Sequence, residues 1–207
     1  MSENISKALV REILENPYDH KWTLQGFGML RLYISDTKRL HIWDASYAVK
    51  DVSLIHDHPW DFNSYIVAGV VRQHRFDVTP RNRLNQNGLD NYEAQTIVCG
   101  EGGCSTGNIY QTGLKRSLIE IYREGDEYSQ KAEEIHLSIP ESGTVTIINR
   151  VFKEDTEHAN VFWPIGEKWV SAEPRKADEE EIYNFTQLAL SKWFNKKEVS
   201  KLGVQIK

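Results

Sequence analysis

The stretch LIHDHPWDFNSYIVAGVV, residues 54–71, places a polar and aromatic box beside runs that have the composition of β-strands. Two strands are predicted here: SLIHDH at 53–58, which runs into the box, and SYIVAGVVRQHRF at 64–76, which follows it. Pro59 cannot donate a hydrogen bond to a sheet ladder, so we expect strand pairing to loosen there. The heptapeptide HDHPWDF at 56–62 is therefore the place where a sheet presents charged and aromatic side chains together.

Further strands are predicted on both sides of the box. MLRLYI and RLHIWDA alternate around the turn-forming SDTK at 35–38, which indicates a β-hairpin. Residues 78–110 are the least strand-like interval and are interpreted as a hairpin with loops that covers a pocket. Many short strands with little helix predict a mainly β sandwich or barrel. The other predicted strands are SLIEIYR, EEIHLSI and GTVTIINRVF.

Helices are predicted only near the two ends. Apolar residues recur at helical spacing up to Leu14, and Asn16-Pro17 ends the pattern. ADEEEIYNFTQLALSKWFNKK at 177–197 has an apolar face, acids in its first turn and lysines in its last. It is expected to pack on the barrel, with an oligomer contact, as in a homodimer, as the alternative. The predicted units are an N-terminal helical extension 1–22, a barrel 23–175 and a C-terminal helix 176–207.

Composition limits the function classes. The 207 residues are 40% hydrophobic and 27% charged, as expected for one globular domain. A net charge of −5 argues against binding to a nucleic-acid backbone, but it allows a local basic pocket for one anionic ligand. The opening residues resemble no signal peptide, and the longest apolar run is too short to cross a membrane. The sequence therefore predicts a cytoplasmic protein with a small-molecule ligand and no membrane partner.

The two histidines of the box have the spacing of metal ligands. Residues two apart on a strand share a face, so His56 and His58 can approach one atom while Asp57 points away. Asp61 has an odd offset from His58 and joins them only if the strand bends at Pro59. Such pairs also occur as surface or hydrogen-bonded core histidines. The pair alone is therefore a moderate signal for a metal.

A third histidine lies on another predicted strand. His136 alternates with apolar residues and shares its face with Glu134 and Ser138. Burying unpaired imidazole or carboxylate groups costs several kcal/mol, so a polar strand face in a barrel needs partners. A metal or a bound substrate would supply them.

These motifs resemble those of the cupin superfamily, whose fold is a jelly-roll, double-stranded β-helix barrel. The first cupin motif is Gly, five residues, H-x-H, three or four residues, Glu, six residues and Gly. Here His56, His58 and Gly69 keep that spacing. The second is Gly, five residues, P-x-G, two residues, His, three residues and Asn, of which Gly125 and His136 are kept.

A longer similarity covers roughly residues 28–172 and adds AEEIHLSIPESGTVTIINR and FWPIGEKWV. It resembles a cupin-like group of bacterial and phage proteins with an HDHPWDF-type box. Asp61 is the nearest replacement for the motif glutamate; support of a ligating histidine or capping of the turn after Pro59 are its alternatives. The positions that depart from the cupin motifs are Lys50, Phe62, Lys131, Glu133 and Pro140.

The resemblance implies a metal centre of His56, His58 and His136, with Asp61 as a fourth candidate. Fe(II) is the first expectation, and Mn, Ni, Co or Zn would also suit such ligands. The implied function is a metal-dependent enzyme, such as an oxygenase, that acts on a small polar or anionic molecule. The alternative is a non-catalytic cupin that binds or sequesters a metabolite or a nucleotide-like ligand.

Five further residues are candidates for substrate binding. Arg72 and His74 could reach an anion at the barrel mouth, or lie on the surface of an edge strand. Thr146 and Arg150 share one strand face, which lines the pocket unless the apolar Val145 face turns inward. Arg150 could bind a carboxylate or phosphate, or form an ordinary salt bridge. Trp163 is the fifth candidate, with packing as its more ordinary role.

Overall fold

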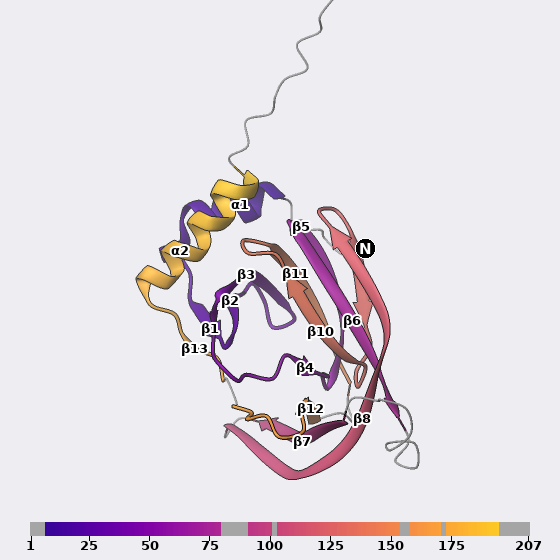
Figure 1. Cartoon of the computed structure of the whole chain (residues 1–207). Helices are drawn as coiled ribbons and strands as arrows, with labels where there is room; N and C mark the ends of the chain where they lie inside the picture. The colour runs from indigo at the N-terminus through magenta and orange to yellow at the C-terminus, as the bar shows by residue number, and fades with distance from the viewer. Residues whose placement is uncertain (1–6, 80–90, 101–102, 154–157, 171–172, 195–207) are drawn as a thin grey trace, which may run out of the picture.

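The computed structural model describes residues 7–79, 91–100, 103–153, 158–170 and 173–194. It confirms a mainly β chain with two α-helices, and its named strands pair antiparallel (Figure 1). One sheet contains, in order, β13 (Arg175–Lys176), β1 (Trp22–Gln25), β2 (Phe27–Tyr33), β3 (Lys38–Ala48), β11 (Val145–Phe152), β5 (Trp60–Ala68) and β9 (Glu127–Gln130). The second closes on itself in the order β10 (Ile135–Pro140), β4 (Ile55–His56), β12 (His158–Pro164), β7 (Asn91–Gly100), β8 (Gly103–Arg123) and β6 (Val70–Thr79).

The hairpin predicted around SDTK is confirmed, because β2 and β3 pair from Tyr33 and Arg39 outward. The interval 78–110 is more regular than expected. Its described part forms β7 and the first half of β8, a continuous strand of 21 residues. Pairing with β7 outweighs the low strand propensity of Gly and Asn in this half of β8. Residues 80–90 of the expected cover lie outside the described residues.

Two glycines of the cupin-like spacing occupy turns. Gly69 joins β5 to β6 with φ +93°, and a Cβ there would lie 2.5 Å from the Thr144 hydroxyl oxygen. Gly125 has φ +91°, and the following Asp126 N–H donates to the Arg123 carbonyl at 2.9 Å. The predicted turn at Gly125-Asp126 is therefore confirmed. Both positions favour glycine because other L-residues are strained at such φ values.

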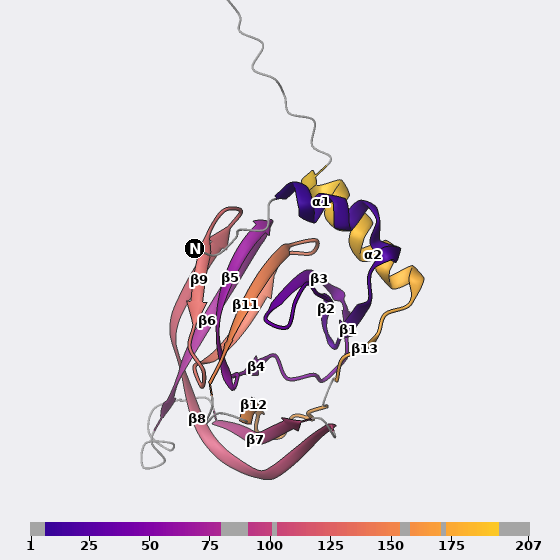
Figure 2. The same ribbon diagram turned by 180° about the vertical axis from the view of Figure 1, so that it is seen from behind.

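The helices pack together on one face of the first sheet (Figures 1 and 2). α1 (Lys7–Glu15) precedes a 3₁₀ turn at Pro17–Asp19, and α2 (Glu179–Ala189) continues as a π-helical turn at Leu190–Phe194. Asp178 and Glu181 form a capping box at the start of α2. Residues 1–6 and 195–207 of the predicted extensions lie outside the described residues.

The first sheet separates two environments. Leu30, Leu40 and Val145 face the helices and belong to the largest buried cluster, together with residues of α1 and α2. The alternate residues Arg31, His41 and Thr146 face the opposite side, where they line a cavity. Alternation along these strands therefore builds a helix-covered core on one face and a polar cavity wall on the other.

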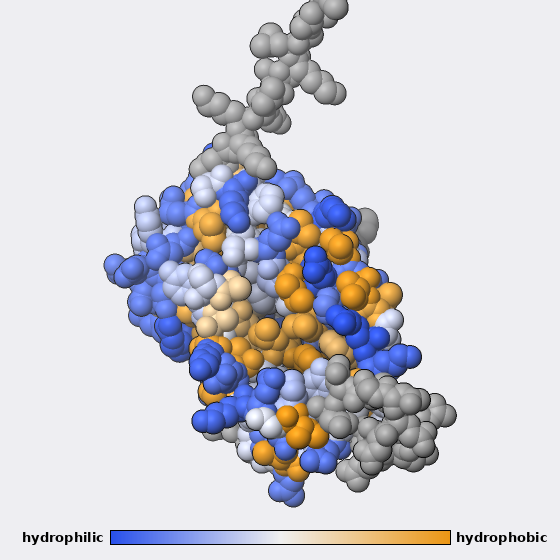
Figure 3. Space-filling view, viewed as in Figure 1, coloured by the Kyte–Doolittle hydropathy of each residue, from blue (hydrophilic) through white to orange (hydrophobic). Residues whose placement is uncertain are grey.

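The exposed surface also differs between the helix layer and the strands. Polar residues cover the helix layer, and hydrophobic residues gather across the middle of the face seen in Figure 1, over the strands (Figure 3). Among the helices that the structure describes, none is long and apolar enough to cross a membrane.

Docking of α2 on the sheet should contribute strongly to stability. Phe185 is fully buried and its ring lies 4.8 Å from that of Tyr47 on β3, so Phe185→Ala should lower the free energy of unfolding by about 3 kcal/mol. Tyr183→Ala is the matched control, because Tyr183 on the same helix is 53% exposed, and should change it by less than about 0.5 kcal/mol. Urea denaturation measures both, and equal effects would contradict this packing.

Candidate metal centre

Three histidines that are distant in sequence lie together in the structure. His56 on β4 is the cross-strand partner of His136 on β10, and His58 follows β4 by two residues. One ring nitrogen from each of the three lies within 4.8 Å of the others, and the Nε2 atoms of His58 and His136 are 3.2 Å apart. The strand pairing therefore brings together the three histidines that the resemblance implied as metal ligands.

Hydrogen bonds to the outer ring nitrogens orient two of these imidazoles. The Nδ1 atom of His56 lies 3.0 Å from the Leu54 carbonyl, which can only accept, so Nδ1 carries the proton and Nε2 keeps a lone pair. The Nδ1 atom of His136 contacts the side-chain amide of Gln73 on β6. A carbonyl acceptor such as that of Leu54 holds a histidine with its other nitrogen directed at a metal, whereas the Gln73 amide nitrogen is a donor and only positions His136.

Aromatic rings pack against the imidazoles of His56 and His58. Phe27 stacks on His56 with ring centroids 5.3 Å apart, and Trp60 stacks on His58 at 4.1 Å. Phe62 meets His58 edge to face. His58, Trp60 and Phe62 therefore share one side of the chain, so the alternation of β5 extends back through Pro59.

The imidazoles are held in the neutral form that a metal requires. Burial lowers the pKa of His58 and of His136 well below the usual 6.5, and each is further lowered by the neighbouring His56. Burial also lowers the pKa of His56, against the opposing effect of the Leu54 carbonyl. Neutral imidazoles can ligate a cation without first losing a proton.

The two carboxylates of HDHPWDF point away from the histidines. Asp57 is buried and accepts hydrogen bonds from the backbone N–H and the side-chain amide of Asn160 on β12. Burial raises the pKa of Asp57, and the bonds from Asn160 counter that shift. Asp57 therefore joins the segment after β4 to β12.

Asp61, the fourth candidate ligand, is not brought to the histidines. Its carboxylate accepts from the Ala132 N–H at 2.7 Å and pairs with Lys153 at 2.8 Å and Lys131 at 3.2 Å. No bend at Pro59 turns it inward, so its odd offset from His58 sends it to the opposite face. Together with the Glu133 N–H, which donates to the His58 carbonyl, it holds the turn that leads to His136.

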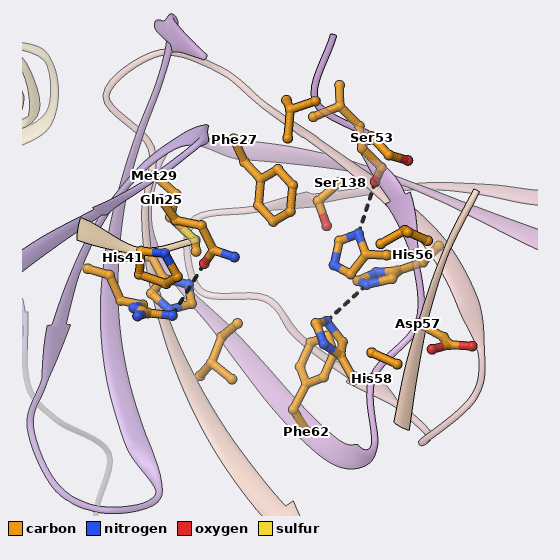
Figure 4. Close-up of a pocket in the computed structure, with 18 of the residues that line it drawn as sticks. Gln25, Phe27, Met29, His41, Ser53, His56, Asp57, His58, Phe62 and Ser138 are labelled. Atoms are coloured by element: carbon orange, nitrogen blue, oxygen red, sulfur yellow. Dashed lines mark hydrogen bonds between the residues drawn. The ribbon is translucent and has the colours of Figure 1, made fainter. Parts of the chain in front are cut away.

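A cavity of about 250 Å³ lies between the histidines and the first sheet. Gln25, Met29 and His41 stand across it from His56 and His58, and Phe27 stacks on His56 (Figure 4). Its volume lies just below the roughly 300–1,000 Å³ of typical small-molecule sites, so it suits a small ligand. Other lining residues include Arg31, Arg39, Trp43, Ser138, Thr146, Ile148, Trp169 and Glu173.

Two of the five candidate substrate-binding residues are on or beside this wall. Thr146 lines the cavity and accepts a hydrogen bond from the Trp43 indole, while the Val145 face packs under the helices. Arg150 lies on the Thr146 face of β11, and its guanidinium is 5.6 Å from the Trp60 ring. It forms no salt bridge within the described part of the chain.

The other three candidates lie away from the cavity wall. On β6, Gln73 faces His136, so its neighbours Arg72 and His74 point to the opposite side. Trp163 is buried, donates to Glu93 at 2.9 Å and stacks on Trp169, a packing role. Burial and two neighbouring arginines, Arg116 and Arg72, lower the pKa of His74.

Sequence reasoning missed several residues of the wall. Arg31, Arg39 and His41 lie in the two strands of the hairpin predicted around SDTK, and none of them is among the predicted site residues. The available signal was their period-two alternation with leucine and isoleucine, which places charged groups on a single strand face. Gln73 gave no comparable signal, because its contact with His136 depends on strand register.

The ion pairs of Asp61 predict a pH effect. They and the Ala132 N–H lower its pKa from 3.8 to about 2, so the folded state binds fewer protons than the unfolded state near pH 3. This contribution to stability is present above about pH 4 and is lost as the pH falls to about 2. In urea denaturation, Asp61→Asn should lower the unfolding midpoint at pH 7, and the difference should shrink by pH 2.5. A difference that is constant with pH would contradict the ion pairing.

Comparisons with known proteins add no family assignment to this geometry. The chain matches no protein-family model, and no curated protein matches it. The strand pairing of His56 with His136 and the cavity beside them are therefore the observations from which function is inferred.

Proposed function

We propose that the chain is a metal-dependent enzyme that acts on a small polar or anionic molecule bound in the cavity. The observation that supports this function is the convergence of His56, His58 and His136 at the cavity wall. Three neutral imidazoles in one place cost free energy through burial, and a divalent metal would offset this cost.

The spacing of one nitrogen pair fits a metal, and all three nitrogens lie within 4.8 Å of one another. A metal about 2.1 Å from each nitrogen separates two ligands by about 3.0–3.4 Å at octahedral to tetrahedral angles. The 3.2 Å between the Nε2 atoms of His58 and His136 lies in that range. The tautomer of His56, with Nε2 free, also suits ligation.

The ligand set favours catalysis over a structural role. Three protein ligands leave coordination positions open for water, dioxygen or substrate, as in catalytic sites. A bound metal would polarise a substrate oxygen or activate water or dioxygen. Fe(II) is our first candidate, with Mn, Ni, Co and Zn as alternatives, because imidazoles bind all of them. Oxygenase chemistry is the corresponding first candidate reaction.

The spacing of the histidines and of Gly69 and Gly125 supports assignment to the cupin superfamily and its HDHPWDF-box group. Two antiparallel sheets are in keeping with a jelly roll. We also propose a cytoplasmic location and a capacity to form homodimers, both of which stay predictions.

A binding protein without catalysis is the second candidate. Asp57 is the carboxylate of the cavity wall nearest to the histidines in sequence, and it is occupied by Asn160. Glu173 is exposed and lies on a different segment of the wall. Among the described residues no free carboxylate base lies beside the histidines, and such a site also suits capture of a metabolite or nucleotide-like ligand.

Removal of one ligand tests the metal centre. The purified chain, reconstituted with Fe(II) or with Mn, Ni, Co or Zn, should hold about one metal per chain by elemental analysis. His136→Ala should reduce this below about a tenth of an equivalent. His158→Ala is the matched control, since His158 is exposed on β12 and should leave metal content unchanged. Metal content below a tenth of an equivalent in the unmodified chain would refute the proposal.

A metabolite screen together with native mass spectrometry distinguishes the two candidate functions. An enzyme should convert some compound in a metabolite screen, and His136→Ala should abolish that turnover. A sequestering protein should release an unchanged copurified ligand when it is denatured. Tight metal binding with no turnover would favour the second function.

A further inference from the structure

Three arginines lie side by side on the cavity face of the first sheet. Arg31 on β2, Arg39 on β3 and Arg150 on β11 come from neighbouring strands in the order β2-β3-β11. Arg31 and Arg39 line the cavity wall directly. We call these three side chains the arginine cluster.

Tyr33 lies at the centre of this cluster. Its ring centroid is 4.5 Å from the guanidinium carbon of Arg39, 5.2 Å from that of Arg31 and 5.6 Å from that of Arg150. Tyr33 is 45% exposed, whereas Arg31 and Arg150 are buried. The cluster therefore extends from the cavity wall to the solvent-exposed ring of Tyr33.

None of the three arginines forms a salt bridge in the described part of the chain, whereas Arg11, Arg75 and Arg175 do. Burial lowers the pKa of Arg150, and the charge of Asp36, which acts from a longer distance, raises it by a smaller amount. Arg31 donates to the neutral oxygens of Thr23 and Gln25, and Arg150 to the Asp36 carbonyl. The Nε atoms of Arg39 and Arg150 are buried without a hydrogen-bond partner.

Burying these arginine charges costs free energy when no anion is bound. Burial lowers the pKa of Arg39 to about 9, opposed by Tyr33, and the charges of Arg150 and Arg31 lower it further. Buried charges are ordinarily paired, and guanidinium forks bind carboxylate and phosphate oxygens bidentately. A protein of net charge −5 thus places three arginines that form no salt bridge with the described residues at this cavity.

The cluster and the histidines belong to the same site. The Trp60 indole stacks on His58 and also lies 5.7 Å from the guanidinium of Arg39. Arg31 bonds to Gln25, which stands across the cavity from His56 (Figure 4). One indole ring therefore separates Arg39 from the histidines, a gap that a small molecule can span.

We propose that Arg31, Arg39 and Arg150 bind the carboxylate or phosphate group of a small ligand whose other end reaches the three histidines. This inference rests on the proposed function, because the histidines are taken to hold the metal at which the ligand reacts. It narrows the proposed substrate class from polar or anionic molecules to anionic molecules. The cluster would hold the substrate by its charged group and so orient the remainder at the open face of the metal centre.

Anion binding is tested on the full chain after removal of metal with a chelator. Isothermal titration at constant ionic strength uses inorganic phosphate in one arm and malonate in the other. We expect one probe or both to bind at about one per chain, and Arg39→Gln to weaken binding at least tenfold. Arg72→Gln is the matched control, because Arg72 is exposed on the opposite face of β6, and should retain affinity within about twofold.

Two further variants guard against misfolding and separate anion binding from metal binding. Arg150→Gln should reproduce the loss if Arg39→Gln does not fold, with circular dichroism as the check on folding. His136→Ala should lose metal yet keep anion binding, which separates failure of this inference from failure of the proposed function. Tighter binding of phosphate or of malonate identifies the anionic group. The inference is overturned if neither probe binds the unmodified chain at about 10 mM, or if folded arginine variants bind as the unmodified chain does.

Discussion

The antiparallel pairing of β4 with β10 is the contact on which the site depends. It sets His56 directly opposite His136 and leaves His58 within reach of both. β4 is only two residues long, so this pairing needs support from outside the ladder. Asp57 supplies it by binding Asn160 on β12, and Asp61 by binding the turn before β10. The carboxylates of HDHPWDF thus position the histidines through bonds to Asn160 and Ala132.

The division of the first sheet into two faces links stability to function. Leucine, isoleucine and valine on one face bury their surface under α1 and α2, which anchors the strands. The opposite face is then free to carry arginine, histidine and threonine along the cavity. Polar groups there need partners, and Trp43 with Thr146 and Arg31 with Gln25 show how part of this need is met within the wall. The unmet part includes Arg39, Arg150 and both ring nitrogens of His41, and these are the groups at which a ligand can gain hydrogen bonds.

The cavity joins two kinds of electrostatic environment. Burial keeps the histidines neutral, as ligands must be before a metal binds, whereas the arginines remain cationic despite burial because their ordinary pKa is so high. A cation site and an anion site can therefore lie in one small volume. Trp60, in contact with both, keeps them apart while contributing apolar surface.

Local chemistry in the sequence determined the elements and the shared face of His56 and His58. Period-two alternation marked most strands, and Asn16-Pro17 ended the first helix as expected. The polar face of His136 was also visible, although only resemblance linked it to the box. Alternation defines two faces but not which one turns inward, so the positions of Thr146, Arg72 and His74 were open. Tertiary structure decided the positions of these three residues. It also turned Asp61 outward and gathered Arg31, Arg39 and Arg150. Each outcome depends on the register between strands that are distant in sequence.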